Sequence, residues 1–244
     1  MKNFKTIFIG LILISGNALA QTVDEIISKY IDAKGGKEKL ASLNTLKVIS
    51  NIQMGPDMKA PMTLIFVNNK SMRLDLTIQG MTMVQCLNGE SGWYISPFQG
   101  KTEPEKMNEE MLKASKEESD ITGPLFNYKE KGNKVELVGK EEMEGTDVFK
   151  LKVTRPNGDV VYMYIDASNY LLLKETQKQK MKDKEIESET LFSNYKMVNG
   201  INFAFSMEQR QVGESSGQSF SVESVEVNPK VDESIFKMPE VAKK

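Results

Sequence analysis

The sequence predicts a mainly β protein of the α+β class, in which one large curved antiparallel sheet follows a short helical segment. From Leu46 onward, apolar residues recur at every second position in short runs, which is the period of a half-buried strand. Turn-forming residues separate the runs, and Asn157-Gly158 and Asn199-Gly200 are strong hairpin signals. About a dozen such runs joined by short links indicate an antiparallel meander.

Two helices precede these strands. Residues Thr22–Glu25 form a capping box, which marks the first turn of a helix. An apolar face then recurs at three- and four-residue spacing, at Val23, Ile26, Ile27, Tyr30 and Ile31. Gly35-Gly36 ends this helix, and a second short helix is expected from about Lys37 to Ser42, with Leu40 buried.

The expected strands are defined by their alternation. Met72, Leu74, Leu76 and Ile78 face one way in the clearest of them, and the intervening polar residues face the other way. The first three runs lie near 46–54, 62–66 and 72–78, and the stretch 79–98 supplies two more, joined by Asn88-Gly89. The later runs lie near 135–138, 148–153, 160–165, 170–175, 190–195, 203–207 and 220–227. Between the fifth and sixth runs, Pro104 to Glu118 predicts an amphipathic helix inserted between the two halves of the sheet.

The first twenty residues predict a secretory signal peptide. Lys2 and Lys5 are followed by the apolar run Ile7 to Ile14, and Ala18-Leu19-Ala20 has the small-x-small pattern of a cleavage site. An N-terminal membrane anchor is the alternative, although the apolar run is short for a membrane span. We therefore expect cleavage after Ala20, export to the periplasm and a single mature domain from residue 21 to 244.

The composition excludes several classes of function. The chain of 244 residues has no histidine and one cysteine, which removes histidine-based nucleophile pairs and the usual zinc sites. The formal net charge is −2 and no basic patch is present, so nucleic acid is not an expected partner. We expect no catalytic residue, no metal and no cofactor, and an inert, buried Cys86.

Methionines are concentrated in one part of the sequence. Of the 15 methionines, eight lie between Met54 and Met111, mostly at alternating positions of successive strands. Methionine is flexible and polarisable, so one interpretation is an adaptable apolar surface that accepts a long hydrophobic guest, with the inserted helix as its cover. The alternative is ordinary core filling, and the alternation is the same in both cases.

Several short motifs resemble the LolA-like family of periplasmic lipoprotein-sorting proteins. The resemblance covers the opening helix Val23–Gly36, the strand Ser71–Asp75, the turn and aromatic pair Asn88–Tyr94, and two late segments, 192–201 and 232–239. It implies an antiparallel sheet rolled into an incomplete, half-open barrel, with helices as a lid over bound lipoprotein acyl chains. It also implies that Arg73 fastens the lid, although Leu74 stands where this strand usually has tryptophan.

These inferences predict a non-catalytic periplasmic carrier or chaperone. Its ligand is expected to be a lipoprotein acyl chain or another lipid. Its expected partners are components of the inner and outer membranes of the envelope, and the protein itself is expected to be a monomer. The candidate ligand-binding residues are Met54, Met62, Leu64, Phe66, Met72, Leu74, Leu76, Met81, Met83, Trp93, Met107 and Met111.

Alternatives stay open at this point. Two of the candidate residues have a second interpretation. Trp93 is also typical of a buried core aromatic residue, and Arg73 is also typical of an arginine that forms a surface ion pair, here with Asp75. An envelope protein-binding or sensor module on the same fold is the second candidate function. A glycosidase that uses acids such as Glu141 and Glu142 is disfavoured, because adjacent strand residues point to opposite faces.

Overall fold

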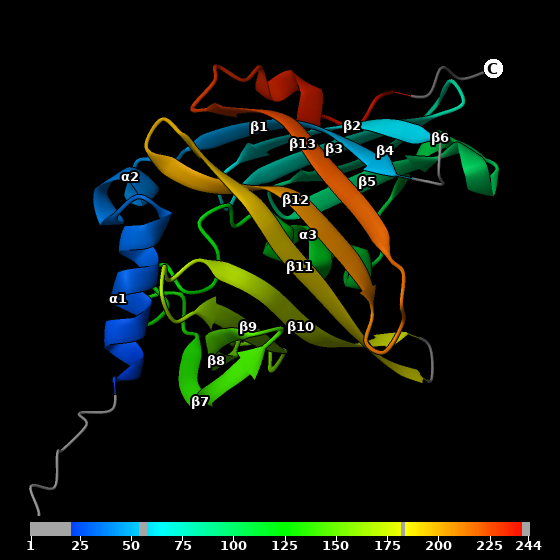
Figure 1. Ribbon diagram of the computed structural model, residues 1–244. Helices are drawn as coiled ribbons and strands as arrows, with labels where there is room; N and C mark the ends of the chain where they lie inside the picture. Colours follow the sequence, from blue (N-terminus) through cyan, green and yellow to red (C-terminus); the bar gives the residue numbers. More distant parts are fainter. Residues whose placement is uncertain (1–20, 54–57, 182–183, 241–244) are drawn as a thin grey trace, which may run out of the picture.

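The computed structural model describes residues 21–53, 58–181 and 184–240. Its main feature is one antiparallel sheet of 13 strands that curves strongly without closing, which confirms the predicted half-open barrel (Figure 1). The strands are β1 (Thr45–Gln53), β2 (Lys59–Val67), β3 (Ser71–Ile78), β4 (Met81–Asn88), β5 (Ser91–Ser96), β6 (Lys101–Lys106), β7 (Lys134–Met143), β8 (Thr146–Thr154), β9 (Val160–Asp166), β10 (Leu172–Met181), β11 (Lys184–Val198), β12 (Ile201–Gln211) and β13 (Gln218–Val227).

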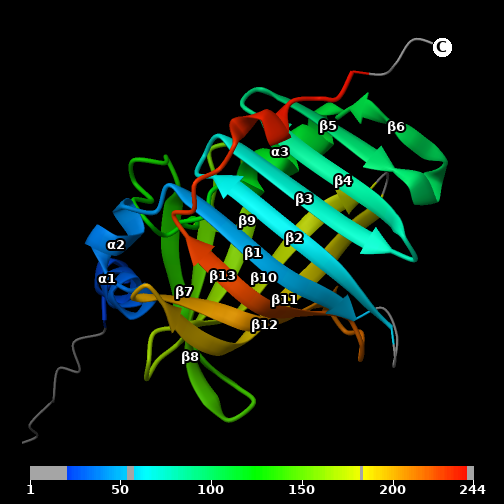
Figure 2. The ribbon, with the colours of Figure 1, turned by 90° about the horizontal axis from the view of Figure 1, so that it is seen from above.

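The strand order explains how the barrel is left open. Every strand except β6 pairs with the next one in the sequence, and β13 pairs with β1, so the order is β6-β5-β4-β3-β2-β1-β13-β12-β11-β10-β9-β8-β7. The consecutive strands β6 and β7 are thus the two edges of the sheet (Figure 2). The segment between them, residues 107–133, carries the chain from one edge to the other across the opening.

Helix α1 (Val23–Lys34) begins as the sequence predicts. Glu25 N donates to Thr22 Oγ1 at 3.3 Å and Thr22 N donates to the Glu25 carboxylate at 2.8 Å, which completes the capping box. The helix ends at Gly35, whose φ is +132° and where a Cβ atom would lie 2.3 Å from Gly200 O. Glycine is therefore required there for the close approach of α1 to the β11–β12 turn.

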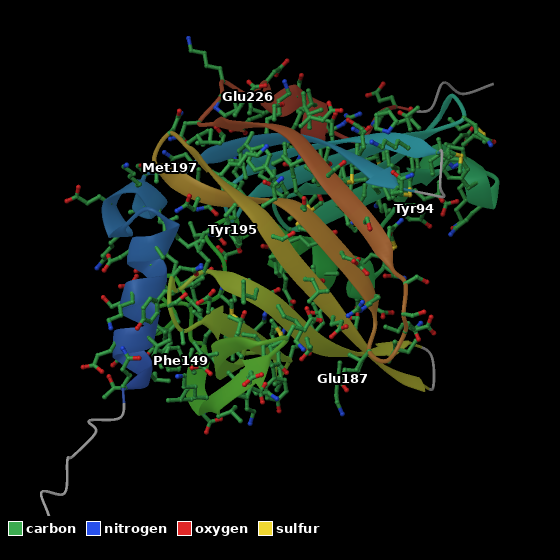
Figure 3. All side chains as sticks on the ribbon, in the orientation of Figure 1. Tyr94, Phe149, Glu187, Tyr195, Met197 and Glu226 are labelled. Atoms are coloured by element: carbon green, nitrogen blue, oxygen red, sulfur yellow. The ribbon has the colours of Figure 1, made fainter. Side chains whose placement is uncertain are left out.

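The helices α1 and α2 (Lys37–Ala41) close one end of the curved sheet (Figure 1). Ile26, Ile27 and Tyr30 of α1 are buried against β8, β9 and β10, and Phe149 of β8 lies beside the helix (Figure 3). Leu40 of α2 is 2% exposed and belongs to a second cluster that includes residues of β1 to β4. The helices therefore contribute the apolar faces that fix the two halves of the sheet at this end.

The inserted helix starts later than the sequence analysis predicts. Helix α3 runs over Glu109–Glu118, with Asn108 as N-cap accepting from Met111 N at 2.8 Å. Pro104, predicted as the start of the helix, lies instead in strand β6, an edge position where a missing N–H costs little. The strand expected from Tyr170 begins at Leu172, because Tyr170 adopts a positive φ of 60° in the preceding turn.

The two faces of the sheet are covered by different parts of the chain. Helices α1 and α3 pack on the concave face, whereas the C-terminal segment, residues 229–240 with the 3-10 turn η2 (Glu233–Phe236), lies on the convex face of β3 to β5 (Figure 1). A second 3-10 turn, η1 (Pro97–Gln99), joins β5 to β6. Alternation along each strand thus divides side chains between two separately covered surfaces.

Candidate functional site in the concave trough

The concave face carries a continuous apolar surface across both halves of the sheet. Leu64 of β2 pairs with Val48 of β1 and with Leu74 of β3, so the three side chains share a face. Leu76 pairs with Met83 of β4 in the same way. On the other side of β1, the pairing of Ile52 with Phe220, of Phe220 with Met207 and of Met207 with Phe192 continues this face through β13, β12 and β11.

Part of this surface is a closed core beside α2. Met72 is 0% exposed and Phe66 is 9% exposed, and both pack with Leu40, Leu87 and Phe126. Met62 and Leu76 are also buried, in a neighbouring cluster with Ile52 and Ala60. For these four predicted ligand-binding residues, the protein's own side chains already supply most of the contact.

The rest of the concave surface is covered less completely. Its apolar side chains face inward and are nevertheless half-buried, which leaves apolar area that a guest can still contact. We call this surface the trough. Its residues are Val48, Leu64, Leu74, Ile78, Met83, Phe192, Phe203, Met207, Phe220 and Val222.

The other predicted residues lie around the trough. Met81 is 43% exposed at the start of β4. Met111 of α3 lines a cavity of about 200 Å³ together with Met83, Gln85 and Tyr94. Met107 packs so closely on Gly92 that a Cβ atom there would lie 2.3 Å from its sulfur. Met54 lies outside the described residues.

Polar contacts attach α3 to both halves of the sheet. Gln85 Nε2 of β4 donates to Ser115 Oγ at 3.0 Å, and Lys116 forms an ion pair with Glu90 in the β4–β5 turn. At the opposite side, Lys113 pairs with Asp159 at 2.5 Å, and Glu117 pairs with Arg155, both in the β8–β9 turn. Solvent-facing ion pairs contribute little stability each, so α3 is positioned across the opening by contacts that are individually weak.

Arg73 and Trp93 lie on the convex face, away from α3 and from the trough. Arg73 donates from Nε to Asp75 at 3.0 Å and from Nη1 to Ile235 O at 2.8 Å. Trp93, 3% exposed, donates from Nε1 to Phe236 O at 2.9 Å. Both side chains therefore hold the C-terminal segment, and their odd-numbered positions explain why they face away from Leu74 and Gly92. In the structure, Arg73 does not fasten the inserted helix.

Cys86 belongs to the same convex cluster. Its side chain is 0% exposed and packs with Val84, Trp93 and Phe236. Burial raises the pKa of the Cys86 thiol to about 12. The thiol is therefore protonated at neutral pH and unreactive, as the sequence analysis predicts.

The sequence analysis missed a group of charged side chains on the concave side. Glu175 of β10 pairs with Met163 of β9, whose side chain is 1% exposed against α1, so the carboxylate also faces inward. Burial raises the pKa of Glu175 to about 7, against the opposing attraction of Arg155 and Lys34. Burial likewise lowers the pKa of Lys34, in the last turn of α1, to about 8. The only sign of these inward charges in the sequence was an acidic residue, Glu175, at a strand position that faces the core.

Replacing Glu175 with Gln is expected to raise the free energy of unfolding by about 2 kcal/mol at pH 8 and to have little effect at pH 4. This size follows from roughly 1.4 kcal/mol per unit of pKa change, reduced because Glu175 is partly exposed to solvent. The pKa is raised in the folded state, so wild-type stability falls as pH rises from 4.5, the ordinary pKa of the group, to about 7. Urea unfolding at both pH values measures this. The exposed Glu226→Gln is the control, and an equal effect at pH 4 and pH 8 would contradict the assignment.

A cavity lies between β10 to β13 and the β7–β8 turn. It has a volume of about 590 Å³ and is lined by Ser193, Ser206, Ser219 and Ser221 and by Glu144 from the β7–β8 turn, among others. These serines alternate with the inward-facing Phe192, Met207 and Phe220 along their strands, so their side chains lie on the convex side. The cavity is also lined by Phe192, Met207 and Phe220, so it adjoins the trough and shares these three residues with it.

Neither a membrane-spanning helix nor a metal site is found in the described part of the chain. No helix there is long and apolar enough to cross a membrane. No cluster of three or more His, Cys, Asp or Glu side chains that could hold a metal ion occurs within residues 21–53, 58–181 and 184–240. The chemistry available in the trough is thus apolar contact, supplemented by the inward charges of Lys34 and Glu175.

Comparison with known proteins defines the class of fold. No protein-family model and no curated protein matches the sequence. Solved structures do match: a LolA superfamily protein from Nitrosomonas europaea superposes with a TM-score of 0.57 at 13% identity, over 89% of this chain and 98% of that chain. A putative outer membrane lipoprotein-sorting protein domain from Vibrio parahaemolyticus gives 0.55 at 14% identity, over 87% of this chain and 94% of that one.

A DUF1329 family protein from Desulfovibrio piger matches equally well, with a TM-score of 0.57 at 14% identity, over 89% of this chain and 98% of that chain. At sequence identities of 13–14%, these three matches show a likeness of fold. The chain has a LolA-like fold, which confirms the resemblance found in the sequence.

Proposed function

We propose that the protein is an exported, non-catalytic lipid carrier of the periplasm, which holds the acyl chain of a lipoprotein or of another lipid in the trough. The observation that supports this most directly is the set of inward apolar side chains of the trough that remain half-buried. A protein that used this face only as a core would bury them, as it buries Met72 and Leu87.

The energy available in such a site is sufficient for a carrier. An acyl chain of about fourteen carbons transfers roughly 10 kcal/mol of hydrophobic free energy at about 0.8 kcal/mol per methylene, before the cost of ordering the ligand. Losses on association reduce this gain, and a net binding free energy of about 8 kcal/mol corresponds to a dissociation constant of about 1 μM. No catalytic group is needed for such binding, and release to an inner- or outer-membrane partner requires only that α3 and its weak polar contacts move.

The purified mature chain, residues 21–244, is expected to bind a fluorescent fatty-acid analogue with 1:1 stoichiometry and micromolar or tighter affinity. Mass spectrometry of an organic extract of the natively purified protein is expected to detect co-purifying acyl lipid. Titration of the probe into the protein measures the affinity, with heat-unfolded protein as the control. Absence of saturable binding at about 50 micromolar protein, together with a lipid-free extract, would contradict the proposal.

A further inference from the structure

The inward surface of the sheet changes from apolar to polar as it approaches the edge strand β6. Leu74 of the trough pairs with Gln85 of β4. In the same row, Gln85 pairs with Tyr94 of β5, and Tyr94 pairs with Glu105 of β6. Residues paired in this way share one face of the sheet, so the row is apolar at the trough and polar beyond it. A ligand that fills the trough therefore meets hydrogen-bonding groups on this side.

A cavity of about 200 Å³ lies where this change occurs. Met83 of the trough lines it from β4, and Met111 lines it from α3, so the cavity adjoins the trough and is covered by the inserted helix. At about 30 Å³ per water molecule it holds roughly seven waters, which is enough for a small head group and too little for a long acyl chain. The full lining is Met83, Val84, Gln85, Tyr94, Ser96, Gln99 and Met111.

The polar residues of this cavity are uncharged. Among the described residues that line it, none is acidic or basic, and Ser96 is a buried polar residue, 7% exposed. Beside the cavity, Lys101 Nζ donates to the Tyr94 hydroxyl and to the Glu105 carboxylate, each at 2.6 Å. Hydrogen bonds from Lys101 and Tyr94 lower the pKa of Glu105, so the two charges neutralise each other at neutral pH. A charged head group would therefore lose its hydration in the cavity without gaining an unpaired opposite charge.

The amide of Gln85 is held in place by the inserted helix. Its Nε2 donates to Ser115 Oγ at 3.0 Å, and Ser115 Oγ donates in turn to Met111 O at 2.9 Å. This uses one donor of the amide and leaves its carbonyl oxygen, while the hydroxyl of Ser96 can both donate and accept. A head group with hydroxyls and an ester carbonyl has the complementary donors and acceptors, and it carries no charge.

We propose that Gln85, Tyr94, Ser96 and Gln99 form a polar subsite that binds the uncharged, hydroxyl-bearing ester head of an acyl lipid, whose chain extends from Met83 along the trough. The inference rests on the proposed function, because it assigns the head group and the orientation of the same ligand. The head group then lies on the side of the sheet that is far from α1, where Figure 3 labels Tyr94. The same chemistry occurs in a free glyceride and in the glyceryl-linked lipid at the N-terminus of a lipoprotein.

The test compares three ligands that share one 18-carbon chain: monooleoylglycerol, methyl oleate and oleate. Competition against a fluorescent fatty-acid analogue measures each affinity. The wild-type protein is expected to bind monooleoylglycerol about tenfold more tightly than either of the others, the effect of one or two hydrogen bonds to buried groups. The double variant Gln85→Met/Ser96→Ala replaces the polar groups with apolar ones of similar or smaller size. Its preference for monooleoylglycerol over methyl oleate is expected to fall to about twofold or less, while its affinity for methyl oleate stays within about twofold of the wild type.

A second variant tests the site at an exposed position, where a substitution is not expected to disturb the fold. Gln99 is exposed and lines the cavity, so Gln99→Lys places a cation at the subsite. It is expected to tighten the binding of oleate about threefold at low ionic strength and to leave methyl oleate unchanged, since only oleate carries a charge. Thr63→Lys adds the same charge on the convex face and is expected to leave all three affinities unchanged.

The double variant has a matched control on the opposite face of the same strands. Thr77 of β3 and Thr82 of β4 are paired, and their hydroxyl oxygens lie 2.9 Å apart at an exposed position. Thr77→Val/Thr82→Val removes these two polar groups and is expected to leave all three affinities unchanged. Thermal unfolding of each variant verifies that it is folded.

The outcomes separate the two proposals. Equal affinity of the wild type for all three ligands, preference for oleate, or an unchanged preference in the folded double variant would overturn the subsite while leaving the carrier function intact. If the double variant does not fold, Gln99→Lys decides, and an unchanged affinity for oleate then overturns the subsite. Failure of all three ligands to bind would overturn both proposals. A diacylglyceryl-cysteine peptide that depends on Gln85 and Ser96 as monooleoylglycerol does would identify the lipoprotein source, and dependence of monooleoylglycerol alone would identify a free glyceride; both results support the subsite.

Discussion

Replacing Leu64 with Lys is expected to weaken acyl-chain binding by about 100-fold, whereas the adjacent Thr63→Lys leaves it unchanged. Leu64 is half-buried in the trough between Val48 and Leu74. A lysine there places an ammonium where the acyl chain would lie, and a loss of about 3 kcal/mol from desolvation and lost apolar contact corresponds to a factor of about 100. Thr63 is on the convex face opposite Asp75, where a new ammonium is hydrated and finds an opposite charge.

Leu64 and Thr63 are neighbours in β2 but point to opposite faces of the sheet. Comparing the two variants therefore shows whether the effect depends on the face of the strand or only on the position in the sequence. Titration of a fluorescent fatty-acid analogue measures the affinity, and circular dichroism and thermal unfolding measure whether both variants are folded. Equal binding by a folded Leu64→Lys variant would show that the ligand does not lie over β2. Equal loss in both variants would show a general effect on the sheet instead of an effect on the trough.

Replacing Phe236 with Ala is expected to lower the free energy of unfolding by about 3 to 4 kcal/mol, the usual cost of a buried aromatic-to-alanine change. Phe236 is 1% exposed and packs with Val84, Cys86 and Trp93 on the convex face. Removing the ring leaves a cavity under the C-terminal segment, where neighbouring strands cannot collapse to fill it. The segment is further held by the partly buried Val231 and Ile235, which pack against the same cluster, and by hydrogen bonds from Arg73 and Trp93.

Urea unfolding monitored by circular dichroism measures this loss. The emission of Trp93 is expected to shift to longer wavelength in the folded variant, because the indole becomes more accessible to water. Met238→Ala is the matched control, since Met238 lies two residues further along and is 39% exposed, and its expected effect is below about 0.5 kcal/mol. A destabilisation of the same small size in Phe236→Ala would contradict the view that the C-terminal segment is part of the fold.

Local signals in the sequence account for much of the fold. The capping box at Thr22 and Glu25 forms as predicted, because its two hydrogen bonds join residues three apart. The Asn199-Gly200 turn adopts φ values of +49° and +78°, the conformation that its residue types favour. The strand alternation was also readable, since the period of two is a property of each strand and does not depend on its neighbours.

The boundaries of α3 were less predictable. Glu, Lys and Met at 105–107 suit the first turn of a helix, and only pairing with β5 makes Lys101–Lys106 a strand. In the structure, Trp93 pairs with Lys106 and Tyr94 with Glu105. Local propensity did not indicate this pairing, because β6 contains Pro104 and mostly charged residues, which are uncommon in strands.

Alternation shows which residues share a face, but it does not show what covers that face. Both faces of β3 to β5 carry apolar residues, and the C-terminal segment, more than 130 residues further along the chain, covers one of them. Trp93 and Arg73 therefore belong to the convex layer, whereas Leu64, Leu74 and Met83 belong to the trough. Likewise, Met72 is fully buried in the cluster of Leu40 and Phe126, whereas Leu74 on the same strand face packs against that cluster and stays half-buried.

The sequence by itself determined the class of this protein: a helix, then an antiparallel meander with a concentration of flexible apolar side chains. These properties depend on residue type and on spacings of two to four residues. The tertiary structure alone decided that β6 and β7 are the open edges and that the segment carrying α3 crosses between them. Each of these arises from contacts between segments distant in sequence, and such contacts depend on how the whole sheet curves rather than on any one strand.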